Sequence, residues 1–158
     1  MNSGLIFLLA FGIGVVAGLR SLTAPAVVAW AAHLGWINLS GSLLAFMGSK
    51  WSVGIFTALA LFELVADQLP STPPRTGAMG LAARIVTGAL TGAALAVAGG
   101  AALAMGAVVG ATGGLVGAFG GYHARVGLVR GLRIPDFAIA LPEDAIAIGL
   151  GLFLVSRF

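Results

Sequence analysis

The sequence predicts an all-α integral membrane protein, with five transmembrane helices and one shorter helical segment, forming a single transmembrane domain over residues 1–158. Two observations lead to this fold class. Hydrophobic residues make up 59% of the chain, and its mean hydropathy is +1.09. Charged residues make up only 8%, against roughly 25% in a soluble domain. So few charges cannot cover the surface of a soluble fold, and the high apolar content excludes disorder.

The first three apolar segments differ in length. Residues 4–19 form an uncharged run followed by Arg20, and we expect an uncleaved first helix because no positive region precedes it and further apolar segments follow. Residues 23–36 are too short for a crossing of about 20 residues, so they either re-enter or form a short buried helix. Residues 51–69 predict a second full span.

Residues 85–124 contain no Asp, Glu, Lys or Arg, and this run is about twice the length of one crossing. Gly99-Gly100 near its middle predicts a tight turn. We therefore expect helices over residues 80–98 and 101–122.

The last span is expected to begin near Pro142, because proline suits the first turn of a helix, and to end near Val155. Glu143 and Asp144 would then lie in that first turn, where the helix dipole favours acidic residues.

The arginines predict an orientation. The loops over residues 70–84 and 123–136 lie two spans apart, hence on one side of the membrane, whereas the turn at 99–100 lies on the other side and has no basic residue. The arginines in these two loops are Arg75, Arg84, Arg125, Arg130 and Arg133. Because basic loops stay on the cytoplasmic side, we expect both loops there. The N-terminus would be cytoplasmic if residues 23–36 re-enter, and on the opposite side if they span.

Glycines recur at helical spacing in the fourth and fifth apolar segments. They are Gly88, Gly92, Gly106, Gly110, Gly113, Gly114, Gly117 and Gly121. Small residues at this spacing let helix backbones approach closely in a membrane. The partner is either another helix of the same chain, which we favour, or a second copy in a homo-oligomer.

Several charges lie at or near membrane depth and are expected to converge on the cytoplasmic half of the bundle. They are Glu63, Asp67, Arg84, Arg125, Glu143 and Asp144. A carboxylate as deep as Glu63 must be neutralised, paired or hydrated. A purely structural role for Glu63 would be an ion pair with Arg84. The alternative role for Arg84 and Arg125 is to extend their side chains to the lipid headgroups.

Arg20 is expected at the opposite end of the bundle. Ser21 or Thr23 would cap a half-helix beginning at Pro25. A helix N-terminus beside an arginine can bind an anion, although an ordinary arginine and cap explain the same pattern.

The sequence indicates no cofactor, no metal site and no catalytic residue. It has no cysteine and two histidines, which excludes a disulfide, a Cys-ligated metal and a His-rich metal cage. The net charge of +3 is scattered, so we expect no nucleic-acid partner. The expected partners are membrane lipids, a small anionic solute or lipid headgroup, and a second copy.

Five segments carry a family resemblance: GLRSLTAPAVVAWAAHLGW (18–36), ELVADQLPSTPPRT (63–76), AARIVTGALTGAAL (82–95), GAFGGYHAR (117–125) and PEDAIAIG (142–149). Together they resemble an uncharacterised family of small bacterial multi-pass inner-membrane proteins, a domain of unknown function. Its acid-then-proline pattern matches Glu63, Asp67 and Pro70, with Gln68 where the family form has lysine. The resemblance implies a bacterial inner-membrane location, and the family has no established activity that could be carried over to this chain.

The leading hypothesis is a transporter or channel-like permease. Glu63 and Asp67 would carry a proton or cation, and Arg20, Arg84 or Arg125 would hold an anionic group. The alternative is a structural membrane subunit that assembles through the glycine faces. A second alternative is a lipid-phosphate enzyme whose acidic residues bind Mg²⁺, although no dense Asp-rich motif is present.

Overall fold

The computed structural model describes residues 1–66, 77–132 and 136–158, apart from the side chains of residues 132, 136 and 137. In this part of the chain all regular secondary structure is helical, as predicted. The elements are α1 (Ser3–Leu19), α2 (Thr23–His33), the short 3₁₀ helix η1 (Ala45–Gly48), α3 (Lys50–Ala66), α4 (Ala78–Ala98), α5 (Leu103–Leu132) and α6 (Asp136–Val155).

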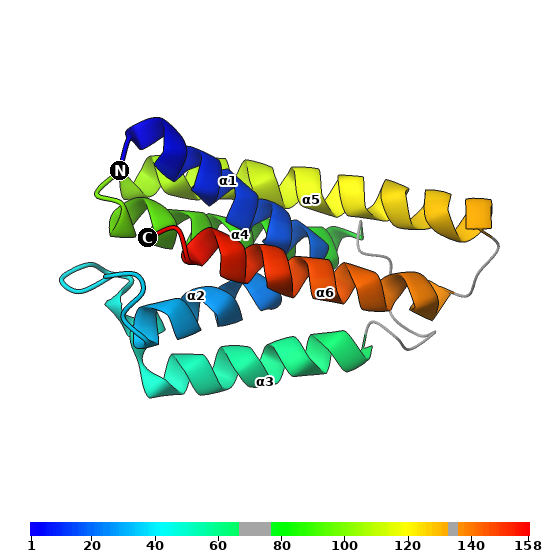
Figure 1. Ribbon diagram of the computed structural model, residues 1–158, viewed down its shortest axis with the longest axis horizontal. Coiled ribbons are helices and arrows are strands. Elements are labelled where there is room, and N and C mark those ends of the chain that lie inside the picture. The colour runs from blue at the N-terminus through cyan, green and yellow to red at the C-terminus, as the bar shows by residue number, and fades with distance from the viewer. Residues whose placement is uncertain (67–76, 133–135) are drawn as a thin grey trace.

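The α-helices run alternately in opposite directions (Figure 1). Both chain termini, the segment between α2 and α3, and the turn between α4 and α5 lie at one end of the bundle, which we call the terminal end. The last turns of α5 and the start of α6 lie at the opposite end. Because α2 runs in the opposite direction to α1, residues 23–36 return to the end from which the chain starts.

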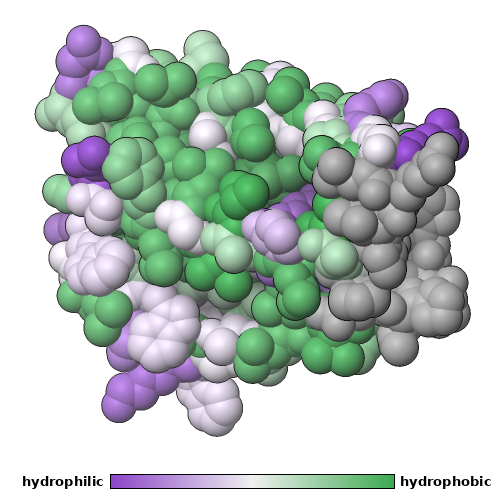
Figure 2. Space-filling model, turned by 45° about the vertical axis from the view of Figure 1, so that its right-hand side comes forward, coloured by the Kyte–Doolittle hydropathy of each residue, from purple (hydrophilic) through white to green (hydrophobic). Residues whose placement is uncertain are grey.

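Three helices are long and apolar enough to cross a membrane: α4, residues 103–131 of α5 and residues 138–155 of α6. α1 is apolar but has 17 residues, and α3 also has 17, ending at Ala66 beside the undescribed segment. The predicted count of five spans therefore stays a prediction. Figure 2 shows a broad hydrophobic face with hydrophilic side chains toward its edges, as expected of a surface in contact with lipid.

Glycines bring α1, α4 and α5 into backbone contact. Gly110 lies between two helices: a Cβ at Gly110 would overlap the carbonyl oxygen of Gly88 on α4, and a Cβ at Gly14 on α1 would overlap that of Gly110. Two turns further along α5, a Cβ at Gly117 would lie 3.0 Å from the Cα of Gly18. The glycine stripes of α5 thus contact α4 and α1 of the same chain, where only a hydrogen atom fits.

The remaining glycines of the predicted set take part in the same packing, with one exception. A Cβ at Gly92 would lie 2.5 Å from the carbonyl oxygen of Gly106, and one at Gly113 would lie 3.0 Å from the Cα of Gly14. Gly121 instead borders a groove between α5 and α6.

The turn between α4 and α5 is confirmed. α4 ends at Ala98, and Gly100 has a φ of +77°, a left-handed conformation that glycine adopts without strain.

The predicted start of the last helix is wrong. α6 begins at Asp136, so that Pro142 lies inside it. Proline in a helix interior removes one backbone hydrogen bond, which the long apolar segment tolerates. Glu143 and Asp144 consequently lie beyond the first turn, and the helix dipole does not explain them. α5 also continues to Leu132, so Arg125 lies within this helix and does not end it.

Candidate functional site

The candidate site is the break between α1 and α2, residues 18–22, which we call the helix break. α1 ends at Leu19 and α2 starts at Thr23, with an extended backbone at Arg20. Gly18 packs against α5 near Gly117, about midway along that 30-residue helix. The break is therefore buried inside the bundle, and Arg20 is 0% exposed. A helix start has N–H groups without partners in the helix, and these must find partners when they are buried.

Glu63 on α3 provides these partners. Its Oε1 accepts hydrogen bonds from the backbone N–H of Ser21 at 2.8 Å and from the Ser21 hydroxyl at 2.6 Å, and its Oε2 accepts one from the backbone N–H of Leu22 at 2.8 Å. The side chain is 8% exposed. A carboxylate at a helix N-terminus is favoured both by the hydrogen bonds and by the helix dipole. Glu63 therefore caps α2 from a different helix.

This arrangement corrects two predictions. Neither Ser21 nor Thr23 caps α2 with its side chain, and the helix begins at Thr23, which places Pro25 in its first turn. The Ser21 hydroxyl donates to Glu63 and does not accept from the helix. Glu63 also makes no ion pair with Arg84, because the start of α2 already supplies its hydrogen-bond partners.

Arg20 forms a buried ion pair between its Nη2 and Oδ1 of Asp144 on α6. Its predicted place, at the opposite end from the acidic residues, is wrong, since α1 ends part-way along the bundle. A guanidinium removed from water needs a counter-charge, because an unpaired buried charge is strongly unfavourable. Asp144, itself buried, provides that charge.

Arg84 on α4 holds the end of α1. Its Nε donates to the carbonyl oxygen of Gly18 at 3.0 Å, and its Nη1 donates to that of Gly80 at 2.9 Å. Because Arg84 is 5% exposed, it does not extend to the headgroups. Gly18 belongs to the last turn of α1, whose carbonyl groups need partners outside the helix.

Three helices thus each send one charged side chain to the helix break: Glu63 from α3, Arg84 from α4 and Asp144 from α6. The other predicted site residues lie elsewhere. Arg125 of α5 pairs with Glu143 of α6 over 3.4 Å, beside an apolar groove of about 220 Å³. Asp67 lies outside the described residues.

The acidic residues are divided between separate partners. Among the described residues, no group of three or more His, Asp or Glu side chains is placed to hold a metal ion. Glu63 binds the start of α2, Asp144 binds Arg20, and Glu143 binds Arg125. Each described carboxylate of the predicted set therefore already has a protein partner.

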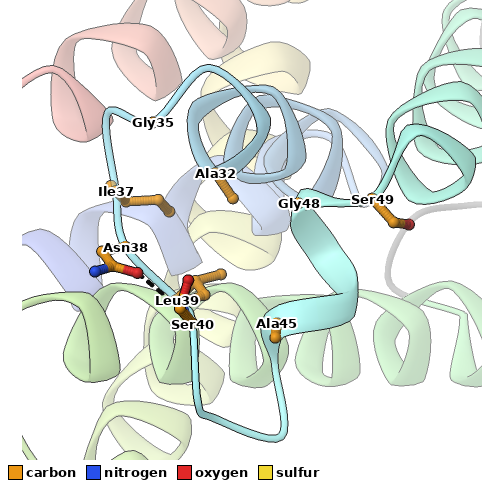
Figure 3. A pocket seen from close by; sticks show the side chains of 9 residues that line it. All are labelled: Ala32, Gly35, Ile37, Asn38, Leu39, Ser40, Ala45, Gly48 and Ser49. Carbon is orange, nitrogen blue, oxygen red and sulfur yellow. Dashed lines mark hydrogen bonds between the residues drawn. The ribbon is translucent and has the colours of Figure 1, made fainter.

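A larger hollow of about 490 Å³ lies at the terminal end, between η1 and the segment that follows α2 (Figure 3). Its lining has no charged side chain, and Asn38 Oδ1 accepts a hydrogen bond from the Ser40 N–H within it at 2.9 Å. The buried charged residues Arg20, Glu63, Arg84 and Asp144 gather at the helix break instead.

The role of Ser21 is the main feature that sequence reasoning missed. Its backbone and hydroxyl provide two of the three hydrogen bonds to Glu63. The available signal was Arg20-Ser21 between two apolar helical segments, which marks a short polar connection.

The family model described as "Domain of unknown function (DUF4126)" matches residues 7–156, which include the whole helix break and the three side chains that reach it. The chain belongs to the DUF4126 family. No curated protein and no solved structure matches the DUF4126 chain.

Proposed function

We propose that this DUF4126 protein is a small multi-pass permease, in which the helix break binds an anionic solute and Glu63 carries a proton. The observation that supports this function is the set of three hydrogen bonds from Ser21 and Leu22 to the buried Glu63 carboxylate. In this proposal α1 and α2 together enter and leave the membrane at the terminal end, and α3 crosses it. The end of the bundle that holds Arg125 and Arg130 is cytoplasmic.

An interrupted helix with a buried N-terminus is a common solution for anion binding in transporters. In this chain the protein's own carboxylate occupies that position, with the buried Arg20 next to Ser21. A protonated carboxyl group has less acceptor capacity, because one of its oxygens becomes a donor. Proton uptake by Glu63 would therefore weaken its contacts with Ser21 and Leu22 and release their N–H groups for a solute anion.

The position of α3 suits such a switch. α3 packs mainly on α2 and η1, whereas α1, α4 and α5 pack closely on one another. In Figure 1 α3 lies at the edge of the bundle. Its displacement would leave the α1–α4–α5 packing intact. Because Arg20 pairs with Asp144 on α6, this pair would not be broken, and the Arg20 guanidinium would stay at the helix break.

Proton flux into liposomes tests this function. The purified protein is reconstituted with a trapped pH-sensitive dye, and a potassium gradient with valinomycin drives protons inward. We expect flux well above that of empty liposomes for the unmodified chain and flux at the empty-liposome level for Glu63→Gln. Glu143→Gln is the matched control, because Glu143 belongs to the separate pair with Arg125. Equal flux for Glu63→Gln and the unmodified chain would overturn the proposal.

A structural membrane subunit is the second candidate. It is favoured by the observation that Glu63, Arg84 and Asp144 all have partners within the chain. Since the glycine faces of α5 contact α1 and α4, a second copy would have to bind other surfaces. For this candidate, Glu63→Gln lowers thermal stability and the unmodified chain conducts no protons.

A further inference from the structure

A groove of about 230 Å³ opens between α2, α3 and α6. Its lining includes Thr23 and Trp30 of α2, Ala60 and Leu64 of α3, and Ile148 and Leu152 of α6. The lining is almost entirely apolar. A space of this size is below the roughly 300–1,000 Å³ of typical small-molecule pockets, which favours a single alkyl chain over a two-chain lipid.

The groove adjoins the helix break on all three helices. Thr23 directly follows Leu22, Ala60 precedes Glu63 by three positions, and Ile148 follows Asp144 by four. Residues three or four positions apart lie on the same face of a helix. The groove therefore leads along the bundle from the residues that bind the Glu63 carboxylate.

Thr23 adds a polar group at this point. The residue is 3% exposed, and among the described residues its hydroxyl oxygen has no hydrogen-bond partner. Buried hydroxyl groups nearly always have a partner, so this hydroxyl is available to a ligand in the groove.

From these observations we infer that the groove binds an aliphatic monocarboxylic acid that enters from the bilayer, with its carboxyl group at Thr23 and the helix break and its alkyl chain along the groove. This inference builds on the proposed function, because it names the solute. The start of α2 already binds one carboxylate, that of Glu63, through Ser21 and Leu22. A ligand carboxyl group has the same chemistry, whereas the helix N-terminus and Arg20 disfavour a cationic headgroup.

The ligand also explains how proton and solute would be coupled. The protonated acid transfers its proton to the Glu63 carboxylate, which becomes a neutral carboxyl group. The resulting ligand carboxylate then accepts the hydrogen bonds of Ser21 and Leu22 and one from the Thr23 hydroxyl. No charge is added to the buried break in this exchange.

Tryptophan fluorescence can test binding without any transport measurement. The chain has three tryptophans, and Trp36→Phe with Trp51→Phe leaves only Trp30, which lines the groove. The probe is decanoic acid with bromine on its terminal carbon, titrated into the protein in nanodiscs. We expect saturable quenching by this acid and at least about tenfold weaker quenching by bromodecane, which has the chain without the carboxyl group.

Variants of Thr23 identify the hydroxyl contribution. In the same background, Thr23→Val should weaken binding of the acid by about tenfold or more, since a hydrogen bond to a charged group contributes about 1.5–3 kcal/mol. Thr23→Ser should bind like Thr23. Because the native hydroxyl has no protein partner, Thr23→Val should fold normally, and an unchanged melting temperature checks this. Ala60→Phe, which fills the groove, should abolish quenching.

Three results would overturn the inference: equal quenching by the acid and by bromodecane, equal binding by Thr23→Val and the parent, or equal quenching by brominated phospholipid in the nanodisc. The last result would mean that a lipid tail occupies the groove. Saturable binding without potential-driven proton flux would retain this site and remove proton conduction by Glu63 from the proposed function, because the exchange of a protonated acid with Glu63 moves no net charge. Proton flux without binding of the acid would retain the proposed function and remove this binding site.

Discussion

Ser21 donates both its backbone N–H and its hydroxyl to the same oxygen of Glu63, Oε1, although the two residues are 42 positions apart in the chain. This contact joins α3 to the start of α2 inside the bundle. The hydroxyl donates over 2.6 Å, which is at the short end of the range for O–H···O hydrogen bonds.

Ser21→Ala should lower the free energy of unfolding by about 1.5–3 kcal/mol, because it removes a buried hydrogen bond to a charged group. Thermal unfolding in detergent measures this loss. The matched control is Ser156→Ala, whose exposed hydroxyl donates only to the carbonyl oxygen of Phe153. Similar melting temperatures for the two variants would contradict the importance of the Ser21 hydroxyl.

Asp144→Asn should destabilise the protein more strongly, by about 3–5 kcal/mol, because it removes the carboxylate that pairs with the buried Arg20 guanidinium. The double variant Arg20→Met, Asp144→Leu should recover much of the loss, since apolar residues can replace a buried ion pair. Unfolding curves for the single and double variants check both statements. If Asp144→Asn unfolds like the parent, Asp144 does not stabilise Arg20.

Gly110→Ala should disrupt the packing of α5 against α4, because its Cβ would overlap the carbonyl oxygen of Gly88. Overpacking of this kind costs about 1–3 kcal/mol, and here the obstacle is backbone that cannot rotate away. Gly120→Ala on the same helix is the control, because a Cβ there meets nothing within 4 Å. We expect lower resistance to SDS unfolding for Gly110→Ala alone, and equal resistance of both variants would contradict the packing argument.

Cysteine labelling can test the orientation, because the chain has no natural cysteine. Ser40→Cys lies at the terminal end, and Gly131→Cys lies at the opposite end beside Arg130. If the arginine-rich end is cytoplasmic, a membrane-impermeant maleimide should label Ser40→Cys in intact cells and Gly131→Cys only after permeabilisation. The reverse pattern would invert the predicted orientation.

The all-helical class and the turn at Gly99-Gly100 could be predicted because each depends on local sequence. Hydropathy defines long apolar helices, and paired glycines allow the left-handed turn residue. The start of α6 was mispredicted because Pro142 satisfies the local rule for a first turn, while six further residues precede it in the helix. The helix formed by the surrounding apolar segment continues through Pro142, although proline at this position favours a helix start.

The partners within the site could not be predicted from sequence. A charged side chain inside an apolar segment needs a partner, and Glu63 is correctly identified as such a charge. This requirement does not say whether the partner is an arginine or the N–H groups of a helix start. Arg20 was placed at the wrong end because its position depends on how far α1 extends beside α5. That relation is determined by glycine contacts such as Gly18 on Gly117, which no periodicity specifies.

The length of α5 has a consequence for the bilayer. Its 30 residues rise about 45 Å, whereas the hydrocarbon core is about 30 Å thick. An untilted α5 therefore extends about 15 Å beyond the core. Its last turns lie past the level of the helix break and beside the start of α6, and they form a narrow rod with an exposed outer face. Glycines 120, 127 and 131 on this rod would meet no neighbour even with an added methyl group. A thicker or thinner bilayer would then change how far the rod is immersed, while the packing around Gly110 and the break stays the same.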